Sequence, residues 1–351
     1  MCGYLLLFVA YNAVIWLTVS KHLLTGKTSL TGDLARIGYL PGMKSDRPNV
    51  DDLPKHHLEI EDYHGQKIDL LTFGDSFSNG GGGGRNRYYQ DYIASLQNMT
   101  VLNIEPYLGM DFITLVSAYC DNGFLDRIRP RIILVSSSEK FCIERLGAEI
   151  DWNRHISLEQ MGKLKHFGFR QYGQLDTAPS LSKSSFMFIN EGNFRYPLYN
   201  ICYQFSPNAF FSKTYYVTLD RPFFSNRQGR KLLFYRDDIR NIGFASPDSI
   251  KRLNDNLNRL ADKLARKGIR LYFMPCVDKY NLYSEFIVHD RFPKSVFFEE
   301  LRPLPKKYTL IDTKAILLDE LKKGEQDVYY ADDTHWSWKA SQKIFESVKF
   351  N

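Results

Sequence analysis

Short apolar runs alternate with amphipathic stretches in the part of the chain that follows residue 66. The predicted strands are residues 67–73, 101–104 and 131–137, and the predicted helices between them are residues 87–97 and 111–125. Strands that alternate with helices are typical of a parallel sheet with helical crossovers. The pattern therefore predicts an α/β domain.

The alternation is interrupted over residues 146–245, which are polar, aromatic and rich in turn-forming residues. We interpret this segment as an insertion that serves as a lid or a substrate platform. An amphipathic helix is then predicted over residues 247–267, with Gly268 as its stop signal. The remaining predicted elements are strands at residues 269–274 and 308–311 and a closing helix at 337–348. Together these elements predict one catalytic domain over residues 67–351.

The first 20 residues contain no charged side chain. About 20 apolar residues span a bilayer as a helix, so we predict an uncleaved membrane anchor over residues 1–24. Tyr4 and Trp16 lie near the ends of the run, where aromatic side chains favour the membrane interface, whereas Asn12 weakens the signal. The alternatives are a buried core helix and a cleaved signal peptide, although the run lacks the basic start and small-residue cleavage site of the latter.

Residues 25–66 are predicted to be a linker or an irregular cap, because Pro41, Pro48 and Pro54 interrupt any helix. Lys21 and Lys27 follow the apolar run, and no basic residue precedes it in the sequence. By the positive-inside rule, this charge pattern places the body of the protein in the cytoplasm.

Composition narrows the class of protein. The chain has 351 residues, of which 44% are hydrophobic and 25% charged, which excludes a disordered or multi-span membrane protein. The five cysteines form no C-x-x-C pair, so neither a disulfide scaffold nor a structural zinc site is expected. The net charge of +6 suits a weakly anionic partner but is too diffuse for nucleic acid. The aromatic content of 15% indicates a large aromatic core or a groove for sugar or acyl groups.

The segment Gly74-Asp75-Ser76-Phe77-Ser78 immediately follows a predicted strand. The carboxyl ends of parallel strands are where α/β sheets place their sites. A serine in such a turn exposes its hydroxyl and leaves its backbone N–H free, so one residue supplies a nucleophile and an oxyanion donor. An ordinary turn with a serine N-cap is the alternative.

A second cluster, Asp332-Asp333-Thr334-His335-Trp336, precedes the last predicted helix. A histidine with carboxylates two and three residues before it is a compact base with its orienting acid: the imidazole takes the serine proton and the carboxylate fixes the tautomer. Taken alone, the cluster is equally typical of a turn with an aspartate N-cap.

Together the two clusters resemble the conserved blocks of the SGNH hydrolase superfamily, in which G-D-S comes first and D-x-x-H last. The forms G-D-S-F-S and D-T-H-W resemble the alginate O-acetyltransferase type and, more distantly, the D-alanyl transfer protein of teichoic-acid modification. The resemblance covers residues 67–145 and 247–350. It implies a flavodoxin-like, three-layer α/β/α fold with a parallel central sheet.

The resemblance also implies a role for each matching residue. Ser76 corresponds to the nucleophile and His335 to the general base. The acid is Asp333 or, by the broader D-x-x-H pattern, Asp332, and we expect Asp333. The backbone N–H groups of Ser76 and Gly109 correspond to the oxyanion donors.

Three further residues are expected near the substrate: Glu139, Arg85 and Trp336. Hydrolases of the superfamily carry an Asn where this chain has Glu139-Lys140, which is close to the Glu-Arg of acetyltransferase-like members and fits transferase chemistry better. Arg85 follows the glycine run 80–84 and either steers an anionic glycan or is a solvated helix start. Trp336 either packs beneath the site or stacks on a sugar. The glycine run is expected to be a mobile loop rather than a phosphate cradle, because it lacks G-K-[ST].

These observations predict a membrane-anchored serine acyltransferase that moves an acyl group, taken to be acetyl, to a cell-surface polysaccharide through an acyl-enzyme. No cofactor is expected, and the spacing of His56, His57 and His64 fits no usual metal site. The resemblance implies a membrane-bound O-acyltransferase as the donor partner. It also implies a periplasmic or extracellular catalytic domain, against the charge pattern around the anchor. An esterase that uses water as acceptor and a non-catalytic glycan-binding or assembly scaffold are the alternatives.

Overall fold

The computed structural model describes residues 2–21, 23, 31–47, 51–168, 188–289 and 292–350. Six parallel strands form a central sheet in the order β1-β3-β2-β4-β7-β8. The strands are β1 (Leu58–Glu59), β2 (Leu70–Phe73), β3 (Val101–Ile104), β4 (Ile132–Ser138), β7 (Arg270–Cys276) and β8 (Thr309–Leu310). Every residue of β2, β3 and β4 is buried, as in a sheet covered on both faces. The predicted parallel α/β sheet is confirmed.

Helices cover both faces of the sheet. The chain passes from β2 to β3 and then back beyond β2 to β4, so right-handed crossovers place α4 (Tyr89–Gln97) and α5 (Phe112–Asp121) on opposite faces. On one face α12 (Pro247–Ala265) packs on α5, and on the other α16 (Trp338–Ser347) packs on α4 and α15 (Thr313–Lys322). The three layers agree with the predicted α/β/α architecture.

The chain also forms shorter helices. They are α6 (Phe124–Ile128), α7 (Glu139–Leu146), α8 (Leu158–Gly162), α11 (Asp237–Arg240), α13 (Lys279–Tyr283) and α14 (Phe297–Leu301). The single helix predicted over 111–125 is divided into α5 and α6, because Gly123 adopts a left-handed φ of 82° between them. The sequence pattern did not predict β1, α7 or α15.

The segment interpreted as an insertion contains α8 in its first half and further regular structure in its second half. There α10 (Gly192–Cys202) is followed by an antiparallel hairpin of β5 (Thr214–Thr218) and β6 (Lys231–Tyr235). The hairpin packs on α3 (Asp33–Gly38), and β6 also packs on α11 and α13. The part of this segment over residues 169–187 lies outside the described residues.

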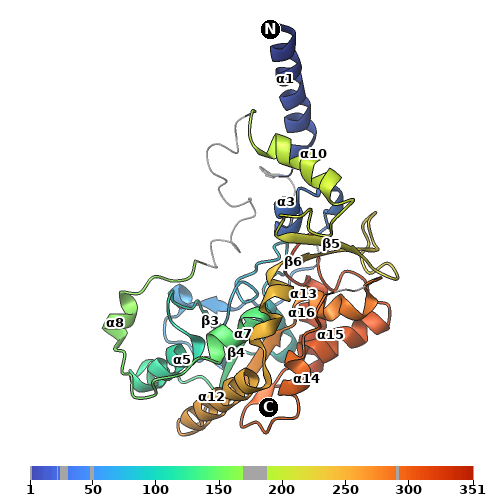
Figure 1. Cartoon of the computed structure of the whole chain (residues 1–351). Helices are drawn as coiled ribbons and strands as arrows, with labels where there is room; N and C mark the ends of the chain where they lie inside the picture. Colours follow the sequence, from blue (N-terminus) through green and yellow to red (C-terminus); the bar gives the residue numbers. More distant parts are fainter. Residues whose placement is uncertain are drawn as a thin grey trace.

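The N-terminal helix α1 (Cys2–Ile15) continues as a π-helix, η1 (Trp16–Ser20), and projects from the body (Figure 1). Within the described part of the chain, this helix of 19 residues is the one long and apolar enough to cross a membrane. Only 6% of it is buried inside the protein, so it is not a core helix. Its length and composition are those of a membrane anchor or a signal sequence.

The next described residues, 31–47, pack against the C-terminal part of the chain. Leu34 and Ala35 of α3 are fully buried. The Ala35 N–H donates to the Asp332 carbonyl at 3.1 Å. A short 3-10 helix, η2 (Pro41–Met43), follows. This part of the predicted linker or cap is therefore packed directly beside the second sequence cluster.

Candidate active site

Ser76 lies in a tight turn that begins where β2 ends. Its carbonyl accepts hydrogen bonds from the Asn79 and Gly81 N–H groups at 3.2 and 2.9 Å. Gly74 precedes the turn, and a Cβ there would lie 1.9 Å from the Ser78 hydroxyl, so no larger residue fits. Ser76 is half-buried. Within the described residues its N–H donates to no protein acceptor, so it is free to face a reacting carbonyl oxygen.

Asp75 fixes this turn from below. Its buried carboxylate accepts the Ser138 N–H at 2.7 Å and the Phe77 N–H at 3.1 Å, and it forms an ion pair with Arg145. Burial alone would raise the pKa of Asp75, but the Arg145 charge and these hydrogen bonds hold the pKa below its ordinary value. The aspartate before Ser76 is therefore a charged anchor that joins β2 to the end of β4.

The structure brings Ser76, His335 and Asp333 into one hydrogen-bonded chain. His335 Nε2 lies 2.7 Å from Ser76 Oγ, and His335 Nδ1 lies 2.7 Å from Asp333 Oδ1. The same Asp333 oxygen accepts the His335 backbone N–H at 2.9 Å. Because the carboxylate accepts from Nδ1, Nε2 is left as the acceptor for the serine proton.

The electrostatics of the pair favour a charged imidazolium. Burial alone would lower the pKa of His335, but the hydrogen bond and charge of Asp333, with the charges of Asp33 and Asp75, raise the pKa above its ordinary value. Burial would raise the pKa of Asp333, yet the hydrogen bond to His335 and the charges of His335 and Arg47 lower it well below the ordinary range. The histidine therefore takes up a proton readily beside an acid that stays ionised.

A third carboxylate, Asp33, supports the histidine from α3. It accepts the Thr334 N–H at 2.8 Å and the Thr334 hydroxyl at 2.6 Å. Burial and the neighbouring Asp333 raise the pKa of Asp33. Asp33, Asp333 and His335 offer side-chain atoms within 4.8 Å of one another, close enough to hold a metal ion. The side chains of Asp33, Asp333 and His335 already form hydrogen bonds within the chain, and this arrangement suits a site for proton transfer.

Asp332 is directed mainly to Arg47, which also lies 3.5 Å from Asp333 Oδ2. Its two oxygens lie 3.2 and 3.3 Å from the guanidinium of Arg47, and one accepts the Gly32 N–H at 2.8 Å. Asp332 is fully buried, and the Arg47 side chain is 5% exposed. The backbone of the same loop is held by Lys279, whose ammonium donates to the carbonyls of Tyr330, Ala331 and Asp333 at 2.7–3.0 Å. Burial lowers the pKa of Lys279 to about 8.

Gly81, in the glycine run, lies against the imidazole. A Cβ at this position would be 2.3 Å from His335 Nε2 and 2.6 Å from Cε1, closer than side-chain carbons approach one another. Because Gly81 has no side chain, its backbone can pack directly against the imidazole ring while Nε2 faces Ser76. Residues 79–84 are buried or half-buried, so in this structure the run is a packed turn beside His335.

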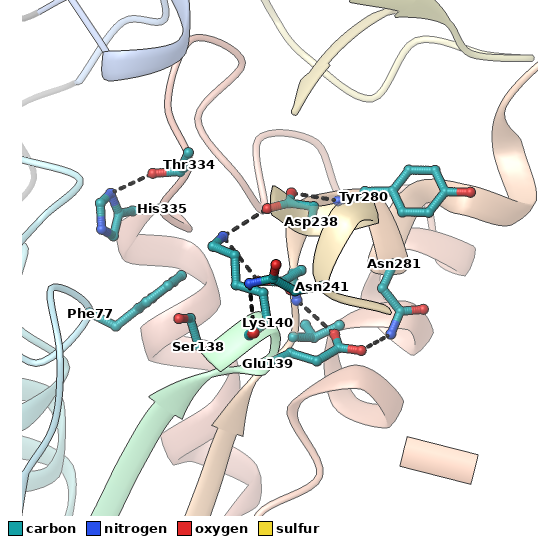
Figure 2. Close-up of polar contacts among 12 residues, drawn as sticks. Phe77, Ser138, Glu139, Lys140, Asp238, Asn241, Tyr280, Asn281, Thr334 and His335 are labelled. Atoms are coloured by element: carbon teal, nitrogen blue, oxygen red, sulfur yellow. Dashed lines mark hydrogen bonds and ion pairs between the residues drawn. The ribbon is translucent and has the colours of Figure 1, made fainter. Parts of the chain in front are cut away.

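The residues expected near the substrate are dispersed. The Glu139 carboxylate is 6% exposed and accepts the Asp278 N–H, the Asn281 amide and the Ser295 hydroxyl at 2.9, 2.6 and 2.5 Å. Figure 2 shows Glu139 directed to Asn281, apart from His335. This geometry does not support a contact between Glu139 and substrate. Burial raises the pKa of Glu139 despite these hydrogen bonds.

Lys140, which follows Glu139, has its ammonium 2.7 and 3.2 Å from the carboxylates of Asp238 and Asp278. Figure 2 shows Lys140 directed to Asp238. Trp336 is 5% exposed and packs edge-on against Phe77, with ring centroids 4.7 Å apart. The position of Trp336 agrees with one of its two expected roles, packing beneath the site.

Among the described residues, neither Arg85 nor Gly109 hydrogen-bonds to Ser76 or His335. Arg85 is on the surface in an ion pair with Asp52. Gly109 lies in the loop after β3 with a φ of 73°, a conformation that favours glycine. Because β3 pairs with β2, this loop leaves the sheet at the same edge as Ser76. The glycan-steering role of Arg85 and the oxyanion role of Gly109 stay predictions.

The sequence analysis missed Asp33, Arg47, Gly81, Arg145 and Lys279. The first two lie in a segment without periodicity, and their partners are about 300 residues away in the chain. No sequence pattern signals such contacts. The unusual run of glycines was the one available signal, since glycine is required where the backbone approaches another group closely.

A parallel sheet with a serine after β2 and a histidine–aspartate pair before α16 is the arrangement that the resemblance to the SGNH hydrolases predicts. Residues 228–348 match the family model of the SGNH hydrolase-like domain of the acetyltransferase AlgX. The predicted resemblance is confirmed over this segment, which contains Asp333 and His335, whereas Ser76 lies outside it. The match begins at residue 228, inside the segment interpreted as an insertion. No curated protein matches the chain.

Proposed function

We propose that this protein is a membrane-anchored serine O-acyltransferase that transfers an acyl group, acetyl in the simplest case, to a hydroxyl of a cell-envelope polysaccharide. The hydrogen-bonded chain from Ser76 through His335 to Asp333 is the observation that carries the proposal. The match of residues 228–348 to an acetyltransferase domain supports the class of reaction.

In the first half-reaction, Ser76 Oγ attacks the carbonyl carbon of the acyl donor while His335 Nε2 takes the hydroxyl proton. The bond to the donor's leaving group breaks, and the imidazolium returns the proton to that group. The negative charge on the carbonyl oxygen is stabilised by the free N–H of Ser76, with Gly109 as the second donor. The product is an acyl ester on Ser76.

In the second half-reaction, the sugar hydroxyl occupies the place that the leaving group has vacated. His335 Nε2 takes its proton, the sugar oxygen attacks the ester carbonyl, and Ser76 leaves with the proton from the imidazolium. Throughout, Asp333 keeps Nδ1 protonated and stabilises the imidazolium. Water in place of the sugar would make the same site an esterase.

The proposed setting is the outer face of a membrane. The exposed apolar helix of residues 2–20 serves as the anchor, the catalytic domain is periplasmic or extracellular, and a membrane-bound O-acyltransferase delivers the donor. The apolar helix and the acetyltransferase match support this setting.

Mass spectrometry of the full-length protein in detergent, incubated with p-nitrophenyl acetate, tests the proposal. We expect a mass gain of one acetyl group on Ser76 that Ser76→Ala abolishes, and faster discharge of that ester by oligosaccharides than by water. Equal discharge in water alone would indicate an esterase. A folded wild-type protein that never acquires the acetyl group would support the non-catalytic scaffold.

A further inference from the structure

Helix α10 presents a row of apolar side chains to the exterior. Phe194, Leu198 and Ile201 of α10 follow one another at intervals of four and three residues, which places them on one helical face. Phe205 follows Ile201 by four residues, in the turn just after the last residue of α10. The exposed fractions of these four side chains are 44%, 49%, 61% and 77%. A helix packed on a soluble domain normally directs such a row of apolar side chains towards the core. Here the row is exposed instead, which is typical of an interaction surface.

The other side of the same helix is firmly attached to the body. Asn193, Tyr199 and Tyr203 are at most 9% exposed. The Tyr199 ring meets the Tyr39 ring edge-on at 5.2 Å, and the Asn200 amide donates to the Tyr39 carbonyl at 3.0 Å. The body therefore fixes which face of α10 is turned outward.

The turn after α10 extends the apolar row. Phe210 and Phe211 are 64% and 52% exposed. Ala209 and Phe210 have φ values of 49° and 66°, a left-handed conformation that costs free energy for residues with a Cβ. The fold maintains this unfavourable turn while Ala209 is buried and Phe210 points outward. Residues 196–212 contain no charged side chain.

This surface is continuous with the N-terminal apolar helix. The Phe194 ring lies 6.2 Å from Phe8 and 5.5 Å from Tyr11. The Tyr11 hydroxyl donates to the Asn193 carbonyl at 2.6 Å, and the Asn193 amide donates to Asn12 Oδ1 at 2.9 Å. Asn12, the polar residue that interrupts the apolar run, therefore has a partner, which lowers the cost of placing both amides in lipid. Figure 1 shows α10 at the base of α1.

We propose that the α10 face lies in a lipid bilayer beside α1, as a second attachment of the protein to the membrane. The α10 face is Phe194, Leu198, Ile201, Phe205, Phe210 and Phe211. Helices of this kind lie in the membrane plane with their apolar side about 5–10 Å deep. The lack of charge over residues 196–212 makes this attachment hydrophobic, so it does not depend on anionic lipids. It is also independent of the proposed acyl transfer.

Spin labels on the full-length protein in liposomes test the proposal. Cys2 and Cys202 are replaced by serine, because the other three cysteines are buried. Single cysteines are then introduced at Ile201, Phe205 or Phe210, and circular dichroism confirms folding. Lys251 is exposed on α12, a helix that lies far from α10 in Figure 1, and serves as the control position.

We expect labels at the α10 face to collide more with oxygen than with a water-soluble nickel chelate, and the label at residue 251 to show the reverse. The result should be the same in phosphatidylcholine and in phosphatidylglycerol vesicles. Nickel collisions at residue 205 equal to those at residue 251 would overturn the proposal. Low access of both reagents with spin–spin broadening would also overturn it, because a second copy of the chain would then cover the face.

Discussion

Asp332 and Asp333 are adjacent in the chain but hold different groups. Asp333 Oδ1 lies 2.7 Å from the His335 imidazole, whereas both oxygens of Asp332 face the guanidinium of Arg47. The Asp333 carboxylate orients the imidazole ring, whereas the Asp332 carboxylate neutralises the buried Arg47 and accepts the Gly32 N–H. Replacement of the two residues should therefore have different consequences.

Asp333→Asn should lower the rate of Ser76 acylation on the order of 10²- to 10⁴-fold, because the amide no longer fixes the tautomer or stabilises the imidazolium. Asp332→Asn should instead lower the free energy of unfolding by about 3 kcal/mol, since Arg47 loses its main buried partner. Acylation kinetics and chemical denaturation of both variants separate the two effects. Equal loss of acylation per folded molecule would contradict the assignment.

The activity should fall on the acid side with a midpoint above the ordinary histidine value of about 6.5. This follows because His335 must be unprotonated to accept the serine proton, and its neighbours raise its pKa. Asp33→Asn removes one of the negative charges that stabilise the imidazolium, so the midpoint should move to lower pH. The exposed Asp319→Asn is the control and should leave the pH profile of acylation unchanged.

Gly81→Ala should lower acylation by roughly 100-fold, because the new methyl group displaces the imidazole from Ser76, and misplacement by about 1 Å has such an effect. The unfolding midpoint should change much less than the rate. Gly243→Ala is the control, since a Cβ there meets nothing within 4 Å. A Gly81→Ala enzyme that acylates at the wild-type rate would show that the close approach of the backbone is not needed.

Arg145→Met should lower the free energy of unfolding at neutral pH by about 3 kcal/mol, because the buried Asp75 carboxylate loses its cation. The pKa of Asp75 lies below its unfolded value, so its contribution to stability is present at neutral pH and is lost as the pH falls through the folded pKa. The deficit of the variant should therefore shrink in acid, where its Asp75 is protonated. Arg131→Met, at an exposed arginine, should show no such pH-dependent deficit.

The sequence predicts those structural features that depend on residues close to one another in the chain. β3 has the predicted bounds, and β2 and β4 differ from theirs by a few residues, because continuous apolar runs between turns mark buried strands. The position of Ser76 after a strand follows from the same local signal.

Other features depend on where side chains point, and the local sequence does not contain that information. Asp332 and Asp333 have nearly the same sequence surroundings, and only the folded loop turns one to Arg47 and the other to His335. Glu139 was expected at the substrate, but the residues that surround it, Asn281 and Ser295, come from more than 140 residues away. Burial and distant hydrogen bonds thus decided its position.

Helix α3 connects the two surfaces on which the proposals rest. It has six residues, a rise of about 9 Å. Its first residue bonds to Thr334, and Tyr39, just after its end, packs on α10. With α10 resting in the bilayer, α3 would act as a spacer that holds Ser76 and His335 at a set height above the lipid. If the protein acts as proposed, its polysaccharide acceptor would have to reach Ser76 within a thin layer next to the membrane.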